Sequence, residues 1–380
     1  MGMLSAFAGF ASSFAVVLQG LQGVGASSAE AASGLMILAV TMGLGGIFLS
    51  IFSRIPVSVA WSTPGAAFLA ISGVPDGGFA VAVGAFLVCS VAIIVAGLFK
   101  PLERAVGAIP MPLANAMLGG ILLGMCVAPF KAIEAFPVAG TVMFAAWALF
   151  GAWRRALAVP AALVAFVAIV VFGLDMPASA FSTIGQNAIP DLVWMTPEFT
   201  LESIINIALP LFIITMASQN LTGVAVIKSY GYRVMPGFWF TTTGVLSAIS
   251  APFGGHGVNL AAITAAMCAG EEAHRDPDKR YWSAIIAGLG YIIFGLLAGV
   301  VTAFVSLAPA IFVQAVAGLA LVGAFARSTQ LAFSEEGTRE AAAVTFLATA
   351  SGMTLFGLSG AFWGLVAGGL VLAARRAMAD

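Results

Sequence analysis

Charged residues are scarce along this chain, and their scarcity limits what it can fold into more than any other feature. Only 8% of the 380 residues are charged and 61% are hydrophobic, whereas soluble domains usually carry about 25% charged residues. A water-soluble protein of this length could not hide so much apolar surface, because much of any folded surface still faces solvent. The composition therefore predicts an integral membrane protein.

Charges, prolines and glycines divide the chain into fourteen apolar segments. A membrane-spanning helix needs about 20 apolar residues, and the chain is long enough for all fourteen. The longest break, 174–200, is rich in acidic residues and prolines and separates two blocks of seven. We therefore predict an all-α polytopic protein with fourteen spans. They are 9–26, 32–53, 56–73, 78–99, 109–129, 136–153, 156–173, 202–222, 235–250, 251–270, 281–305, 308–326, 340–356 and 360–375.

The distribution of basic residues supports this count. With the N-terminus in the cytoplasm, the cytoplasmic loops and tail hold 14 of the 15 Lys and Arg residues, and only Lys131 lies outside. Cytoplasmic loops of membrane proteins carry such an excess. We therefore expect an inner-membrane protein with both termini in the cytoplasm and an extracytoplasmic connector at 176–200. The net charge of −1 gives no field that would recruit nucleic acid.

Seven spans in each half predict an inverted internal repeat, because an odd-numbered repeat inserts its two copies in opposite orientations. Two short matches occur in the same order in both halves. Gln19–Val24 resembles Gln219–Val224, and Ser62–Gly65 resembles Ser250–Gly254.

Spans three and ten are interrupted by proline and glycine. In span three, Val57–Ser62 alternates like a strand, and Thr63–Gly65 then suits the capped first turn of a helix. In span ten, Ala251–Gly257 forms the break, and we expect a helix over Val258–Ala269. Two half-helices that begin near the midplane would point free N–H groups at one place, which favours an anion. Two proline kinks without a ligand are the alternative.

His256, within the second break, is the only strongly placed titratable residue in the predicted spans. Ionisable groups inside a membrane are functional candidates, and an imidazole changes its charge near neutral pH. The hypothesis is that His256 senses or carries a coupled proton, or contacts a substrate carboxylate. The alternative is a neutral histidine bonded to a backbone carbonyl.

The amide and aromatic side chains near the breaks could either bind a ligand or stabilise the fold. Buried amides in spans one and eight need hydrogen-bond partners, so they either donate to a carboxylate or tie helices together. Trp61 and Phe253 either contact an aromatic ligand or simply pack. The predicted substrate-binding residues are Gln19, Gln22, Trp61, Ser62, Thr63, Gly65, Gln219, Asn220, Phe253, Gly255, His256 and Gly257.

Other chemistries lack the residues that they need. The three cysteines, Cys89, Cys126 and Cys268, lie in apolar stretches without a CxxC or Cys/His cluster, so we expect free thiols and no metal or cofactor. An intramembrane enzyme would need a nucleophile–base pair or metal ligands. The sequence contains no HExxH or GxSxG motif, so we expect no enzyme activity.

Three segments resemble the bacterial benzoate:proton symporter family: Ser13–Gln22, Pro56–Ala67 and Ala251–Ala266. The similarity extends over nearly the whole chain. The resemblance implies a core domain of 1–100 and 201–306, and a gate domain of 101–175 and 307–380. It also implies a substrate held between the two breaks, elevator-like motion of the core against the gate, and often a homodimer.

The resemblance implies proton-coupled uptake of benzoate or a related aromatic carboxylate. Nucleobase-transporting relatives of this family carry membrane-embedded glutamates in spans eight and ten, whereas the only acidic residue of either span here is Glu202, at the first position of span eight. The absence of embedded glutamates fits an anionic substrate, which a nearby carboxylate would repel, and leaves the proton carrier open. Transport of another small anion or of a nucleobase is the alternative, and an anion channel is a further one.

Overall fold

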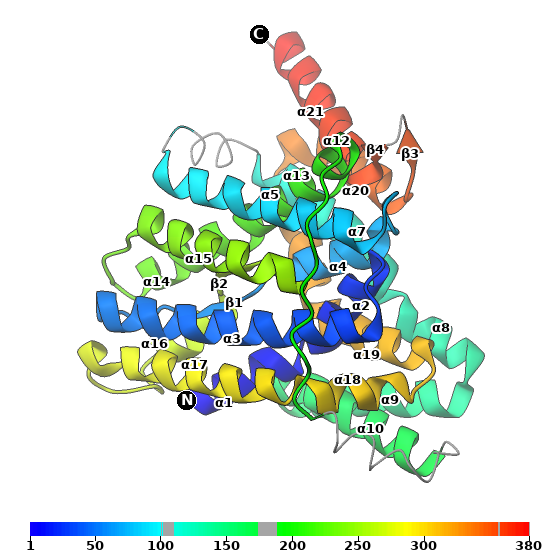
Figure 1. Ribbon diagram of the computed structural model, residues 1–380. Helices are drawn as coiled ribbons and strands as arrows, with labels where there is room; N and C mark the ends of the chain where they lie inside the picture. Colours follow the sequence, from blue (N-terminus) through cyan, green and yellow to red (C-terminus); the bar gives the residue numbers. More distant parts are fainter. Residues whose placement is uncertain (100, 102–109, 174–187, 356–357, 380) are drawn as a thin grey trace.

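A computed structural model describes residues 1–99, 101, 110–173, 188–355 and 358–379, and within these residues the chain is mostly helical (Figure 1). The helices of the first half are α1 (Gly2–Ala11), α2 (Phe14–Gly23), α3 (Ser28–Ser53), α4 (Thr63–Ser72), α5 (Phe79–Leu98), α7 (Met111–Cys126), α8 (Ala128–Ala135), α9 (Pro137–Trp153) and α10 (Ala158–Gly173). Those of the second half are α12 (Leu201–Ser203), α13 (Leu209–Thr215), α14 (Leu221–Ser229), α15 (Pro236–Ser250), α16 (Ile263–Ala269), α17 (Tyr281–Leu296), α18 (Ala298–Ser306), α19 (Ala310–Ala332), α20 (Arg339–Ala350) and α21 (Gly360–Ala379). The described strands are β1 (Val59–Trp61), β2 (Val258–Leu260), β3 (Thr354–Leu355) and β4 (Leu358–Ser359).

Several helices are long and apolar enough to cross a membrane, as the composition predicted. Six described helices meet this condition, and a seventh does if α17 and α18, bent by 48° at their junction, form one span. Each of the fourteen predicted ranges overlaps at least one described helix. The predicted start of the first span was wrong, because α1 and α2 together form an apolar helix over Gly2–Gly23.

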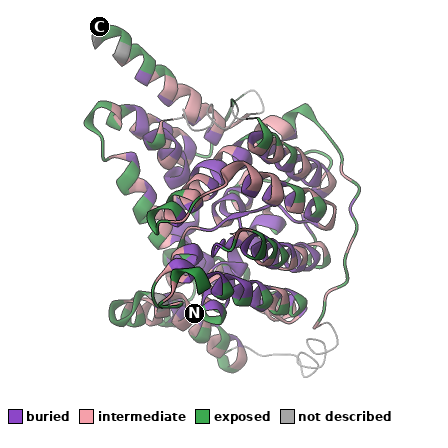
Figure 2. Ribbon diagram, turned by 90° about the vertical axis from the view of Figure 1, so that its left-hand side faces the viewer, coloured by how far each residue is buried: buried purple, intermediate pink, exposed green. Residues whose placement is uncertain are grey.

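The helices pack in two groups. In the first group, α3 packs against α17 and α15, α15 against α5, α1 against α17, and α2 against α4. In the second group, α7 packs against α19 and α20, α20 against α21, and α8 and α10 against α9. Seen along the helices, buried residues gather where the helices face one another and exposed residues lie on the outer faces (Figure 2).

Glycines allow the closest contacts between these helices. A Cβ atom on Gly43 of α3 would lie 2.5 Å from the carbonyl oxygen of Gly288 of α17, and one on Gly288 would lie 2.6 Å from that of Gly43. Real Cβ atoms essentially never approach a neighbour so closely. Any larger residue at either position would push α3 and α17 apart.

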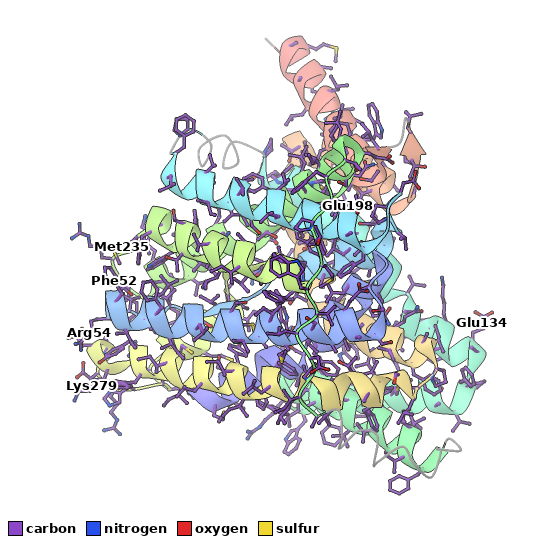
Figure 3. All side chains as sticks on the ribbon, in the orientation of Figure 1. Phe52, Arg54, Glu134, Glu198, Met235 and Lys279 are labelled. Carbon is purple, nitrogen blue, oxygen red and sulfur yellow. The ribbon has the colours of Figure 1, made fainter. Side chains whose placement is uncertain are left out.

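Charged side chains mark the two ends of the helix stack. Arg54 and Lys279 lie at one end, whereas Glu134 lies at the opposite end (Figure 3). Lys100 and Arg104, which belong to the predicted cytoplasmic set, lie outside the described residues. Residues 176–187 of the predicted connector also lie outside them. The rest of the connector, 188–200, has no helix or strand and crosses the outside of α3, α15 and α5 (Figure 1).

Candidate functional site

The two predicted breaks meet as a buried pair of antiparallel strands. Val59 of β1 pairs with Leu260 of β2, and Trp61 pairs with Val258. All of these side chains are buried. Each strand satisfies the backbone groups of the other, which is the condition for extended backbone inside a membrane. Because one strand comes from each half and they run in opposite directions, the pair fits an inverted repeat.

The structure corrects two details of this region. The expected helix over Val258–Ala269 was wrong: residues 258–260 form β2, and α16 begins only at Ile263, because the backbone of β2 pairs with β1. The second repeat match was also in the wrong register. Ser62 directly follows β1, whereas Ser250 ends α15 and precedes β2, so it occupies the place of Ser53 at the end of α3.

The start of α4 is partly capped by its own side chains. Ser62 is the N-cap residue, and its Oγ accepts a hydrogen bond from the N–H of Gly65 (3.2 Å) and lies 2.9 Å from Oγ1 of Thr215 on α13. Pro64 has no N–H group. Gly65 bonds Ser62, so the N–H of Thr63 is the first-turn donor that takes part in none of the hydrogen bonds found among the described residues. The helix offers this donor and the positive end of its dipole.

The two half-helices begin at opposite ends of the strand pair. The N–H of Ser62 reaches the carbonyl of Gly257, and the N–H of Ala261 reaches that of Ser58. Ser62 lies four positions after Ser58, which corresponds to about 13 Å of strand. The two helix starts are therefore separated by about the length of the strand pair, and a shared anion site between them stays a prediction. Since α16 has only 7 residues, α4 is the stronger anion-attracting end.

His256 connects the second break to this helix start. Its side chain is buried, and Nε2 lies 3.0 Å from the carbonyl oxygen of Ser62. A carbonyl oxygen only accepts, so Nε2 carries the hydrogen and Nδ1 keeps a free lone pair. No described residue bonds this Nδ1. The alternative, a neutral histidine bonded to a backbone carbonyl, therefore accounts for Nε2. It does not account for Nδ1, which has no partner among the described residues.

The amides predicted in spans one and eight occupy different environments. Asn220, at the end of a π-helical turn over Met216–Asn220, is buried, and its Oδ1 accepts a hydrogen bond from the N–H of Leu260 (3.0 Å). It therefore ties span eight to β2. Gln19 and Gln219 are half-buried, and Gln22 is exposed at the end of α2. π-Helical turns such as Met216–Asn220 are frequent at functional sites.

The two aromatic candidates both have protein packing partners. Nε1 of Trp61 donates to Oγ of Ser13 (2.8 Å), and its ring lies 5.3 Å from that of Phe10. The ring of Phe253 packs edge-to-face on Trp194 of the connector, with the centroids 5.3 Å apart. These contacts fit the packing alternative for both residues.

The flanking glycines, Gly255 and Gly257, keep the loop next to His256 compact. A Cβ on Gly255 would lie 2.5 Å from Oγ of Ser250, and Gly257 has a φ of +137°, which disfavours other residues.

A hollow that the sequence did not reveal lies between α7 and span eight. Its cavity volume is about 10 Å³, which is room for about one water molecule. The hollow is beside the start of α4, because Thr215, which contacts Ser62, lies between lining residues on α13 and the π-turn. Asn115, a polar residue within an apolar segment, was its only sequence signal. The lining residues are Met111, Ala114, Asn115, Met117, Leu118, Ile213, Ile214, Ala217 and Ser218.

Residues 1–374 match the model of a family described as benzoate membrane transport protein. The chain belongs to this family. It is 37% identical over 380 residues to inner membrane protein YdcO of Escherichia coli, covering 100% of this chain and 96% of that protein. It is 32% identical over 367 residues to a benzoate membrane transport protein of Acinetobacter baylyi, covering 97% and 92%. The family match confirms the resemblance seen in the sequence.

A solved structure shares the fold of this family member. The transmembrane domain of a cyanobacterium bicarbonate transporter, BicA, aligns with a TM-score of 0.62 over 97% of this chain and 96% of that chain. The sequences are only 14% identical, so the likeness concerns the fold alone. A transporter fold of this kind fits the inverted repeat expected from the sequence.

Proposed function

We propose that this protein is a secondary active transporter that takes up benzoate or a related aromatic carboxylate together with a proton. Membership of the benzoate membrane transport protein family supports the substrate class. The buried region supports an anion, because none of the described Asp or Glu residues is buried. In this proposal the protein lies in the inner membrane with fourteen spans and both termini in the cytoplasm.

One observation carries the proton coupling: the free Nδ1 of His256 beside the start of α4. An unpaired charge is costly to bury, whether it is a carboxylate or an imidazolium, and a pair of opposite charges offsets part of that cost. A carboxylate near the Thr63 N–H would favour a proton on Nδ1, and a proton there would favour the carboxylate. Each ligand therefore raises the affinity of the other, and the two travel together.

The aromatic ring is placed between the walls of the hollow, which must move apart to admit it, because the described hollow has room for about one water molecule. Its walls are mainly apolar, with Met117 and Leu118 on α7 and Ile213 and Ile214 on α13. A ring between these walls would place its carboxylate toward the start of α4. Apolar walls with a few polar groups are typical of small-molecule sites.

We further propose that the two helix groups correspond to a core domain of 1–100 and 201–306 and a gate domain of 101–175 and 307–380. The hollow lies between them, so sliding of the core against the gate would expose the site to each side in turn. Cysteines replacing Asn115 on α7 and Ser218 on the π-helical turn, both of which line the hollow, test this. Cross-linking them should stop transport, whereas full activity after cross-linking would contradict the sliding motion.

A matched control joins two helices of the same group. Glu340 and Arg375 form an ion pair between α20 and α21, so a cross-link between cysteines at these positions should leave transport unchanged.

The experiment that tests the substrate is a ligand panel on the purified protein. A ligand that binds only the folded state stabilises it by about 2.7 kcal/mol at 100 times its Kd. Benzoate and substituted benzoates should therefore raise the melting temperature, and uracil and sulfate should not. Stabilisation by uracil or sulfate alone would support the alternative substrates instead. Saturable benzoate uptake driven by a pH gradient in vesicles would distinguish a symporter from a channel.

A further inference from the structure

The connector packs on the loop that leads to His256. The N–H of Met195 donates to the carbonyl oxygen of Pro252 at 2.7 Å. Trp194 covers the ring of Phe253. Residues 251–254 lie in the short turn between α15 and β2, immediately before His256. The connector therefore holds this turn from outside the helix stack (Figure 1).

Ser33 of α3 joins the connector to the same turn. Its Oγ accepts a hydrogen bond from the N–H of Val193 (3.0 Å) and donates one to the carbonyl oxygen of Phe253 (3.0 Å). The side chain is fully buried. One hydroxyl thus fixes three segments at once: α3, the connector and the turn before His256.

The contacts around this hydroxyl leave little room for movement. A Cβ on Gly34 would lie 2.7 Å from the carbonyl oxygen of Gly254, and Gly254 itself has a φ of +89°. The buried side chain of Met195 lies against the same glycine. The connector is attached a second time where the N–H of Glu198 donates to the carbonyl oxygen of Ala80 at the start of α5.

We infer that the connector helps to hold His256 in place within the core and that Ser33 is a positioning residue for His256. By fixing the turn, Ser33 holds Nε2 against the Ser62 carbonyl and keeps Nδ1 beside the start of α4. Without its hydroxyl, the Phe253 carbonyl and the Val193 N–H both lose this partner, and the turn is held less firmly, by Met195 and Trp194 alone from the connector. The inference rests on the proposed function, in which His256 takes the coupled proton.

Replacement of Ser33 should therefore loosen coupling more than it impairs substrate binding. The test compares two activities of Ser33→Ala in proteoliposomes: benzoate accumulation driven by a pH gradient, and exchange of labelled for unlabelled benzoate without a gradient. We expect accumulation to fall at least fivefold while exchange stays within twofold of the unmodified protein. Trp194→Ala, which removes an exposed connector side chain that packs on the same turn, should shift the ratio in the same direction by a smaller factor.

The matched control is Ser53→Ala in the same helix. The Oγ of Ser53 donates to Leu49 within α3 (2.6 Å), so its loss should leave the ratio unchanged. Parallel loss of accumulation and exchange in Ser33→Ala would overturn the inference, as would a normal ratio or an equal effect of Ser53→Ala. If the unmodified protein itself shows no accumulation driven by a pH gradient, the proposed function fails instead.

Discussion

At the scale of single residues, two residues meet at the start of α4, Ser62 through its backbone carbonyl and His256 through its ring. Ser62 caps the helix and bonds Thr215, while its carbonyl oxygen receives Nε2 of His256. The same residue therefore fixes the helix that attracts the anion and orients the ring that would take the proton. Removing the Ser62 hydroxyl should disturb the anion side of the site while leaving the backbone contact to His256 in place.

Ser62→Ala should lower stability and weaken substrate binding together. An N-cap serine contributes about 1 kcal/mol, and the buried Thr215 hydroxyl also loses a partner, so we expect a loss of about 2 kcal/mol. The KM for benzoate should rise severalfold because the start of α4 is less ordered. Thermal unfolding in detergent and uptake kinetics measure the two effects.

The control for this substitution is Ser72→Ala at the other end of α4, where Oγ bonds only the Phe68 carbonyl of the same helix. An unchanged KM in Ser62→Ala, or an equal increase in Ser72→Ala, would argue against a role of the cap in binding.

At the scale of elements, the two breaks and the start of α4 could be predicted from the sequence. The pairing of β1 with β2, which places the two half-helices, could not. Proline, glycine and a preceding serine mark the start of α4, because each has a local backbone reason to be there. The start of α16 depends on pairing of Val258–Leu260 with a strand some 200 residues earlier in the chain. A local sequence pattern cannot predict a partner so distant in the sequence. The hollow is equally non-local, since α7 and α13 become neighbours only in the folded protein.

The glycines of the first repeat match have a packing role that can be tested. A Cβ on Gly20 would lie 2.5 Å from the carbonyl oxygen of Ala66, so Gly20→Ala must push α2 away from α4. Overpacking of this kind costs about 1–3 kcal/mol, and thermal unfolding should show it. Gly323→Ala, where nothing lies within 4 Å, should be neutral or slightly stabilising. Equal stability of the two variants would contradict the close packing of α2 on α4.

At the scale of the whole molecule, the charges at its ends predict its orientation. Arg54 and Lys279 lie at one end of the helix stack and Glu134 at the other (Figure 3). Basic residues favour the cytoplasmic side, so the end with Lys279 should face the cytoplasm. The connector would then cross the core near the opposite side, where it holds the turn before His256.

Cysteine labelling tests this orientation. The three natural cysteines are buried, so a new exposed cysteine should give the main signal with a membrane-impermeant thiol reagent. Lys279→Cys should react in inside-out vesicles, and Glu134→Cys should react in right-side-out vesicles. Labelling of both from the same side would show that the predicted topology is wrong.

The central claim is that benzoate and a proton bind as a pair, with the proton on His256. The most direct measurement is proton uptake when benzoate binds to the purified protein in weakly buffered solution near pH 7.5. The account predicts about one proton taken up per benzoate bound, with the affinity falling about tenfold for each unit of rising pH. His256→Gln keeps a donor for the Ser62 carbonyl but cannot be protonated, so it should bind benzoate without proton uptake. Binding without proton uptake in the unmodified protein, or equal uptake in His256→Gln, would contradict the account.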